Sequence, residues 1–366
     1  GSIVLIPIYF FIIRRLNLKF TTAIFIYFYR AIFSIAFILY ANNNPADAKM
    51  YLRGNVENIG PVGSGFILNI IDLSTNYLNI KGYALYSLFG LLGAVGCCYL
   101  YSAIKKCEIR RVNKINNISV LFCFLPSLTF WTLAPGKDVI CFLAITYALY
   151  SYVQLIDNNF KLNLKIIFST LILLIVRPHV GASLIIGYIL FYIFQIKKKK
   201  NLYLRLIILS AITLAFFLLI PFLQTFGSID IFNPADSIIL LEERFSQTAI
   251  DRANMNYVSR VIFFLFSPLP TIKFSILYLA EYINTIFIVY FLFTLLKDKK
   301  SYRNISSNPF FLYSIILLLI LSLIIYNPGL ASRQKWMFLL PLIVSLKNNR
   351  FLNYKKTSAS IFSDQS

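Results

Sequence analysis

The sequence has little charge and almost no histidine. Only 13% of its 366 residues are charged, and His179 is the single histidine, whereas 58% of the residues are hydrophobic. A soluble protein of this size could not bury so many apolar side chains. The scarcity of charge therefore excludes an ordinary soluble domain, and we expect lipid to surround most of the chain.

The chain also lacks the motifs of several common chemistries. It contains no P-loop, no ABC signature, no HEXXH motif and no cluster of His and Asp residues with metal-ligand spacing. Its five cysteines have no paired CxxC spacing, so neither zinc nor a disulfide framework is indicated. We therefore expect no metal and no cofactor.

Long apolar runs dominate what is present. They cover residues 2–13, 20–40, 82–104, 117–134, 139–156, 165–176, 182–196, 203–224, 258–296, 309–326 and 336–346. The run at 258–296 is interrupted by "FSPLPTIKF", which predicts a helix or re-entrant piece at 258–268 and a span from about residue 274. The pattern predicts an all-α fold, in which residues 1–366 form one polytopic integral membrane helical bundle of about 11 transmembrane helices.

Most of the 35 basic residues lie in every second connection between these runs. These basic connections are residues 14–19, 105–114, 161–165, 197–205, 297–303 and 347–356. The positive-inside rule makes this face cytoplasmic. The net charge of +21 is then a topology signal spread over short loops, and we expect no nucleic-acid partner. These loops are too short for a nucleotide-sugar-binding domain, so an enzyme of this kind must take its activated donor from the membrane.

The opposite, exoplasmic face carries two longer loops, at about 41–81 and 225–257, and three tight corners, at 134–139, 177–181 and 327–336. The loop at 225–257 alternates apolar pairs with acids and arginines. This pattern predicts an amphipathic helix that lies on the outer surface of the membrane.

Several basic residues stand at exoplasmic helix ends, where the positive-inside rule disfavours them. We call these the outer basic set: Lys137, Arg177, Arg260, Arg333 and Lys335. Each alone is explained by snorkelling to headgroups or by capping a helix C-terminus. A compact bundle would bring the helix ends together, however, and such a set of cations suits a lipid-linked diphosphate.

Two proton acceptors lie on the same face. His179 follows Arg177 by two residues, and it either takes a proton or is a hydrogen-bonded structural residue. Asp47, in "NNNPADAKMYLRG", either caps a helix or acts as a base. Glu281 and Arg30 fall inside apolar runs, where we expect each to be buried with a polar neighbour.

Four stretches together resemble a known group of proteins. They are Asp47 followed by Tyr51, "FWTLAPGKDVICFLAITYALY" (130–150), "RPHVG" (177–181) and "NPGLASRQKWMFLLPLIV" (327–344). The chain resembles the Wzy-type O-antigen or capsule polymerases and EpsG-like proteins, which in turn resemble GT-C-type glycosyltransferases. The resemblance implies a GT-C-like membrane fold and a metal-independent, inverting transfer on the periplasmic face of the bacterial inner membrane. A glycan on undecaprenyl diphosphate would move onto a sugar hydroxyl of another lipid-linked repeat unit, in lipopolysaccharide, capsule or exopolysaccharide biosynthesis.

The resemblance also implies roles for single residues. Arg177 and Arg333 would hold the diphosphates, supported by Lys137 and Lys335, and His179 or Asp47 would serve catalysis. The expected substrate-binding set is completed by Arg53, Asp138 and Arg260. The second long loop lacks a histidine and a clear arginine repeat, which departs from the family pattern. The expected partners are undecaprenyl-diphosphate-linked glycans, membrane lipids, and a chain-length regulator and flippase of the same pathway.

Two other functions remain open from the sequence. A GT-C transferase would add one monosaccharide from a polyprenyl-phosphate donor, with Asp47 as the base. A flippase or transporter for the lipid-linked glycan would carry charges along a central path and would often show inverted repeats. We find no convincing internal repeat, and the basic residues outside the cytoplasmic loops gather at one face, which favours an enzyme.

Overall fold

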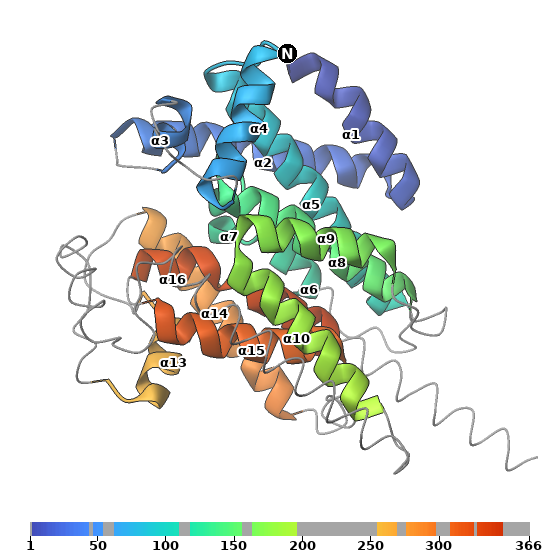
Figure 1. Cartoon of the computed structure of the whole chain (residues 1–366), viewed down its shortest axis with the longest axis vertical. Helices are drawn as coiled ribbons and strands as arrows, with labels where there is room; N and C mark the ends of the chain where they lie inside the picture. Colours follow the sequence, from blue (N-terminus) through green and yellow to red (C-terminus); the bar gives the residue numbers. More distant parts are fainter. Residues whose placement is uncertain are drawn as a thin grey trace, which may run out of the picture.

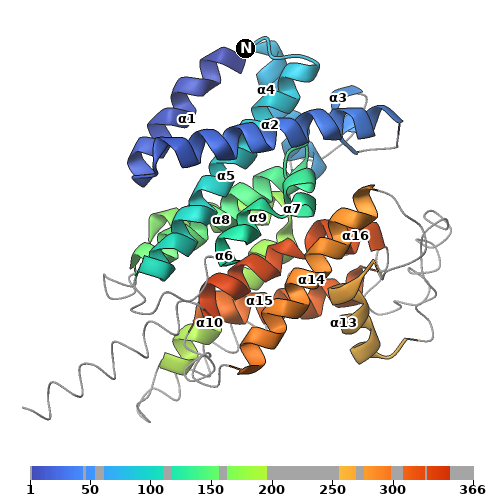
Figure 2. The same cartoon turned by 180° about the vertical axis from the view of Figure 1, so that it is seen from behind.

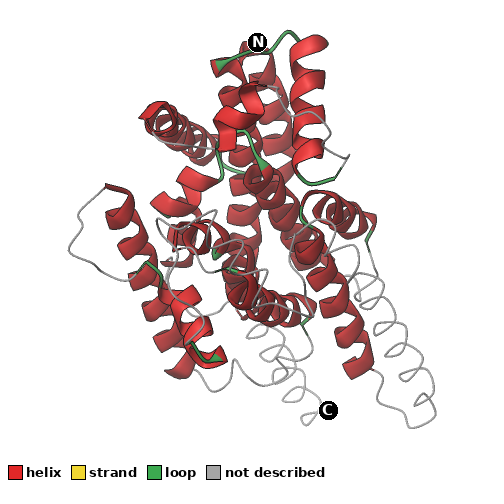
Figure 3. Ribbon diagram, turned by 60° about the vertical axis from the view of Figure 1, so that its left-hand side comes forward, coloured by secondary structure: helices red, strands yellow, loops and turns green. Residues whose placement is uncertain are grey.

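The described part of the protein is entirely helical in its regular structure. The computed structural model describes residues 2–43, 47–53, 62–109, 118–155, 163–195, 255–268, 276–297, 308–325 and 328–346, and no strand occurs among them (Figure 3). The prediction of an all-α fold is confirmed for this part of the chain.

The helices follow the apolar runs of the sequence. In chain order they are α1 (Ser2–Leu16), α2 (Phe20–Asn43), α3 (Asp47–Arg53), α4 (Ser64–Asn76), α5 (Tyr83–Ile109), α6 (Ile118–Leu121), the 3-10 helix η1 (Phe122–Phe124), α7 (Pro126–Trp131), α8 (Lys137–Leu155), α9 (Leu164–Val176), α10 (Pro178–Gln195), α13 (Tyr257–Phe266), α14 (Ile276–Lys297), α15 (Pro309–Ile324) and α16 (Pro328–Gln334). A further helix covers residues 336–346.

The exterior of the bundle is apolar. Among the described helices, α2, α5 and α8 are long and apolar enough to cross a membrane, and α9, α10, α13 and α15 are shorter apolar helices. Large side chains on α2 point outward, as shown by Phe28 at 62% and Ile32 at 65% exposure. Such a surface suits lipid and not water, so the chain has the character of a helical membrane protein. The expected span at 203–224 and the expected amphipathic helix in 225–257 lie outside the described residues, apart from 255–257.

One expected span is broken into pieces. The run at 117–134 predicts a single helix, but the structure divides it into α6, η1 and α7. The break falls at Pro126, which has no N–H to donate and holds Leu125 in an extended conformation, with φ −61° and ψ 126°. The prediction of one continuous span here is wrong. By contrast, the expected division of 258–296 is confirmed, because α13 and α14 are separate helices.

The loop at 41–81 is partly helical and is attached to the bundle. It contains α3 and α4, and α4 contacts α9. The backbone N–H of Gly63 donates to the carbonyl of Ile175 over 2.8 Å. Gly63 has a φ of +67°, which side-chain-bearing residues rarely adopt, so glycine permits this attachment.

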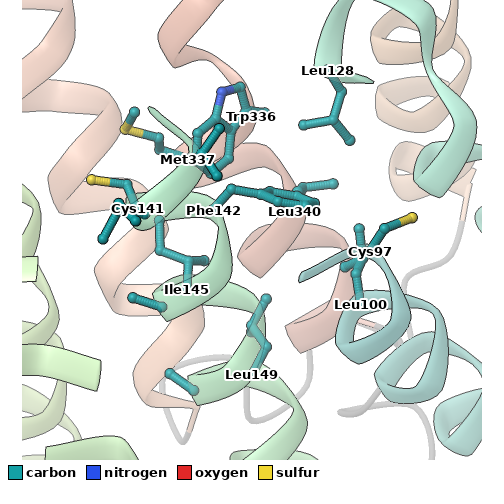
Figure 4. Packing of buried hydrophobic residues seen from close by; sticks show 14 of the residues in the cluster. Cys97, Leu100, Leu128, Cys141, Phe142, Ile145, Leu149, Trp336, Met337 and Leu340 are labelled. Carbon is teal, nitrogen blue, oxygen red and sulfur yellow. The ribbon is translucent and has the colours of Figure 1, made fainter. Parts of the chain in front are cut away.

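The core lies where α8 meets its neighbours. α8 packs between α5 and α9, and α10 packs along α15 (Figures 1 and 2). In Figure 4, Phe142 and Ile145 of α8 lie between α5 and the helix at 336–346. The Phe142 and Trp336 rings meet edge to face, with centroids 5.4 Å apart. α8 is therefore anchored on both sides, which fixes the position of its first turn.

Glycine permits the close approach of α10 to α15. A Cβ at Gly187 would lie 2.8 Å from both the Pro309 carbonyl and the Tyr313 nitrogen, whereas a Cβ at Gly90 would meet nothing nearer than 3.8 Å. We expect Gly187→Ala to destabilise the protein by about 1–3 kcal/mol through overpacking. Gly90→Ala, the matched control, should be neutral or stabilising by about 0.5–1 kcal/mol. Thermal unfolding in detergent measures both, and equal melting temperatures would contradict this account of the α10–α15 contact.

Candidate anion-binding site

Three chain corners meet at one end of the bundle. We call it the corner end, and α3, α7 and α16 lie there, toward the left in Figure 1 and the right in Figure 2. Asp138 accepts a hydrogen bond from Nη2 of Arg177 at 2.5 Å and another from Nε of Arg333. We call these three residues the Asp138 cluster. The expectation that Arg177 and Arg333 come together is confirmed.

Local sequence explains why each member lies at a corner. Asp138 is in the first turn of α8, where the helix dipole favours a carboxylate. Arg177 stands between α9 and α10 with φ −143° and ψ 89°, because Pro178 ends α9 and begins α10. Arg333 lies in the last turn of α16.

The cluster is largely buried and carries more positive than negative charge. Asp138 is 3% exposed and Arg177 is 8% exposed, while the Arg333 side chain is 20% exposed. A buried charge is tolerated only when it is paired, and one carboxylate here faces two guanidinium groups. The Nε of Arg177 is buried and makes no hydrogen bond within the described part of the chain. The cluster therefore brings together two guanidinium groups, the donors that bind anionic oxygens most strongly.

An aromatic ring also contacts Arg333. The Arg333 guanidinium lies over the Trp131 ring, with Cζ 5.7 Å from its centroid. The Trp131 indole N–H in turn donates to Glu281 over 3.4 Å, and Glu281 also accepts from the hydroxyl of Ser127. Sequence reasoning did not single out Trp131 or Ser127, although Trp131 ends α7 a few residues before the Asp138 corner.

Both ionisable groups expected inside the bundle are buried with polar partners. Glu281 is 6% exposed, and Arg30 is 1% exposed. Arg30 Nη2 donates to the Thr132 carbonyl at 2.6 Å and to its hydroxyl at 2.7 Å. The prediction made for this pair is confirmed, and the segment 127–132 supplies partners to both.

His179 is enclosed beside Arg177. It stands in the 177–181 corner, between the expected spans at 165–176 and 182–196, and its Nε2 is buried without a partner among the described residues. Burial, and then the positive charges of Arg177 and Lys137, lower the pKa of His179 to about 3. An imidazole with so low a pKa is a weak base, and this favours a positional role over proton transfer.

The first helix of the outer loop packs on the Asp138 corner. A Cβ at Gly136 would lie 3.7 Å from the Tyr51 ring, and the Tyr51 hydroxyl donates to Ser64 at 3.3 Å. α3, whose ends are Asp47 and Arg53, is therefore placed near the cluster. The side chains of Asp47 and Arg53 lie outside the described part of the protein, so their expected roles stay predictions.

The other members of the outer basic set contact parts of the chain outside the Asp138 cluster. The Lys335 ammonium donates to the carbonyl of Ser267, just beyond the C-terminus of α13, and Arg260 Nε donates to the Met255 carbonyl at 3.1 Å. The Lys335 contact fits the capping of a helix C-terminus, whereas Arg260 contacts the chain just before the N-terminus of α13. Lys137 precedes Asp138, and a Cβ at Gly63 would lie 3.6 Å from its Nζ, which places it beside the start of α4.

Comparison with known proteins gives no assignment. No family model matches the chain, and neither a curated protein nor a solved structure matches it. Among the described residues, no group of three or more His, Cys, Asp or Glu side chains is placed to hold a metal ion.

The Asp138 cluster should contribute to stability. We expect Asp138→Asn to destabilise the protein by about 3–5 kcal/mol, because it leaves two guanidinium groups near each other without their carboxylate. Asp72→Asn, at an exposed position of α4, is the matched control and should change stability by less than about 0.5 kcal/mol. Thermal unfolding of both variants tests this, and a neutral Asp138→Asn would mean that the arginines do not depend on the carboxylate.

Proposed function

We propose that the protein is a membrane glycosyltransferase that polymerises undecaprenyl-diphosphate-linked oligosaccharide repeat units. One observation carries the proposal: Arg177 and Arg333 converge from separate corners on Asp138, at one end of an apolar helical bundle. A site with these properties suits an anionic head group on a lipid tail. The tail would remain in the bilayer while the head group reaches the arginines.

The proposed reaction uses the arginines to stabilise the leaving group. An acceptor sugar hydroxyl attacks the anomeric carbon of the donor, the bond from that carbon to the diphosphate oxygen breaks, and the configuration inverts. Negative charge grows on the diphosphate as it leaves, and guanidinium groups that are already in place bind it best at that moment. The hydroxyl proton passes to a base, for which Asp47 is the leading candidate given the low pKa of His179.

The proposed setting is the bacterial inner membrane, with the corner end on the periplasmic side. The basic loops at the other ends of the apolar runs support this orientation through the positive-inside rule. A flippase and a chain-length regulator of the same pathway are the proposed partners, since lipid-linked units must first reach the periplasmic face.

The arginines give the first functional prediction. Arg177→Ala and Arg333→Ala should each lower the rate of transfer at least tenfold, since a lost charge-assisted contact costs about 1.5–3 kcal/mol. Arg177→Lys should also be impaired if binding is bidentate. The assay incubates the purified protein with lipid-linked repeat units and resolves the products by size.

The controls of this assay separate the alternatives. Lys81→Ala, which removes an exposed cation from the same loop region, should keep full activity. A ladder of products supports polymerisation, whereas a single added sugar indicates the monosaccharide transferase. Full activity of both alanine variants would remove the support for a diphosphate site.

His179 gives the second functional prediction. We expect His179→Gln to keep most of the activity, because an imidazole with a pKa of about 3 is neutral throughout the range from pH 5 to 9 and adds no titration step there. If His179 were the general base, the same substitution would lower turnover by about 10²–10⁴-fold. The pH dependence of turnover in the wild type and in His179→Gln distinguishes these two roles. A large loss of turnover with an intact fold would make His179 the base.

A further inference from the structure

Glu281 is a buried carboxylate that the proposed reaction leaves without a role. It lies in α14, a largely apolar helix that enters the bundle from the corner end, and it is 6% exposed. Ionisable groups at such positions are costly and usually serve a function. Their contacts therefore indicate what the function is.

The hydrogen-bond partners of Glu281 are neutral. Its carboxylate accepts from the hydroxyl of Ser127, from the indole N–H of Trp131 at 3.4 Å and from the amide of Asn284 at 3.4 Å. Two of these partners belong to α7, so the carboxylate attaches α14 to α7. Asp138 differs in that its hydrogen-bond partners are two guanidinium groups, although the Lys335 ammonium also interacts with Glu281 electrostatically.

Trp131 connects Glu281 to the candidate anion site. Its ring carries the Arg333 guanidinium on one face, with Cζ 5.7 Å from the centroid, while its N–H points to Glu281. A cation is attracted to the face of an indole, and the attraction depends on where the ring lies. A fixed acceptor for the N–H therefore fixes the surface on which Arg333 rests.

We propose that Glu281 is a positioning residue for Arg333 and acts through the Trp131 indole. The carboxylate holds the ring, the ring contacts the guanidinium, and Asp138 accepts a hydrogen bond from that guanidinium. The role in ligand binding rests on the anion site of the proposed function, whereas the link from Glu281 to Trp131 does not. Glu281 itself touches neither donor nor acceptor in this arrangement.

Two substitutions at Glu281 distinguish the effect of its hydrogen-bond acceptor from the effect of its charge. Glu281→Leu removes the acceptor, whereas Glu281→Gln keeps an oxygen that accepts from both the indole and the Ser127 hydroxyl. We expect Glu281→Leu to weaken binding of undecaprenyl diphosphate in nanodiscs by about 5- to 10-fold, the scale of a lost cation–π contact. Glu281→Gln should stay within about twofold of the wild type, because the hydrogen bond is retained.

A double-mutant cycle tests the route through Arg333. If Glu281 acts on binding through Arg333, the variant with both Glu281→Leu and Arg333→Ala should bind about as weakly as Arg333→Ala alone. Losses that multiply would overturn the proposal, as would unchanged binding in Glu281→Leu. If Glu281→Leu fails to fold, Trp131→Phe replaces it in the cycle, since it keeps a ring and removes the N–H.

Tryptophan fluorescence tests the first link without any ligand. The chain has two tryptophans, so Trp336→Phe leaves Trp131 as the single reporter. In that background Glu281→Leu should shift the Trp131 emission, whereas Glu281→Gln should leave it nearly unchanged. An emission maximum that is the same in all three proteins would overturn the proposal. Failure of the wild type to bind undecaprenyl diphosphate, together with the expected emission shift, would instead reject the proposed function and retain the positioning of Trp131.

Discussion

The carboxylate of Asp138 is the interaction on which the corner end depends. It joins the start of α8 to the α9–α10 corner through Arg177 and to α16 through Arg333. Two guanidinium groups would repel each other in a largely buried place, and the carboxylate between them removes most of that cost. The same carboxylate therefore holds three chain corners together and keeps two guanidinium groups side by side.

The fold class could be predicted from composition, since apolar runs with little charge leave few alternatives to a helical membrane bundle. The convergence of Arg177 and Arg333 could also be predicted, because alternating basic loops assign both to one face. The role of Asp138 as their shared partner could not be predicted. α8, α9 and α16 come together through the packing of apolar surfaces, and the sequence of such surfaces does not specify which helices become neighbours. For the same reason the sequence offered helix capping for Lys335 but did not identify Ser267, 68 residues away, as the partner.

The break at Pro126 shows how a local rule overrides a hydropathy pattern. Hydropathy treats 117–134 as continuous, but the proline ends the helical hydrogen bonding and allows α7 to take its own direction. As a result α7 contacts α14, α2 and α16. Ser127 and Trp131 both belong to α7, so the direction that α7 takes after the break brings both of them to Glu281.

The segment from Ser127 to Thr132 limits which substitutions the chain can accept over evolution. It supplies partners to three ionised side chains, Arg30, Glu281 and Arg333, which belong to the beginning, the later part and the end of the chain. A replacement that removed these partners would take contacts away from side chains on three helices at once. The segment is therefore constrained by three distant regions together, and a chimera that exchanged residues 127–132 alone between diverged chains would disturb all three.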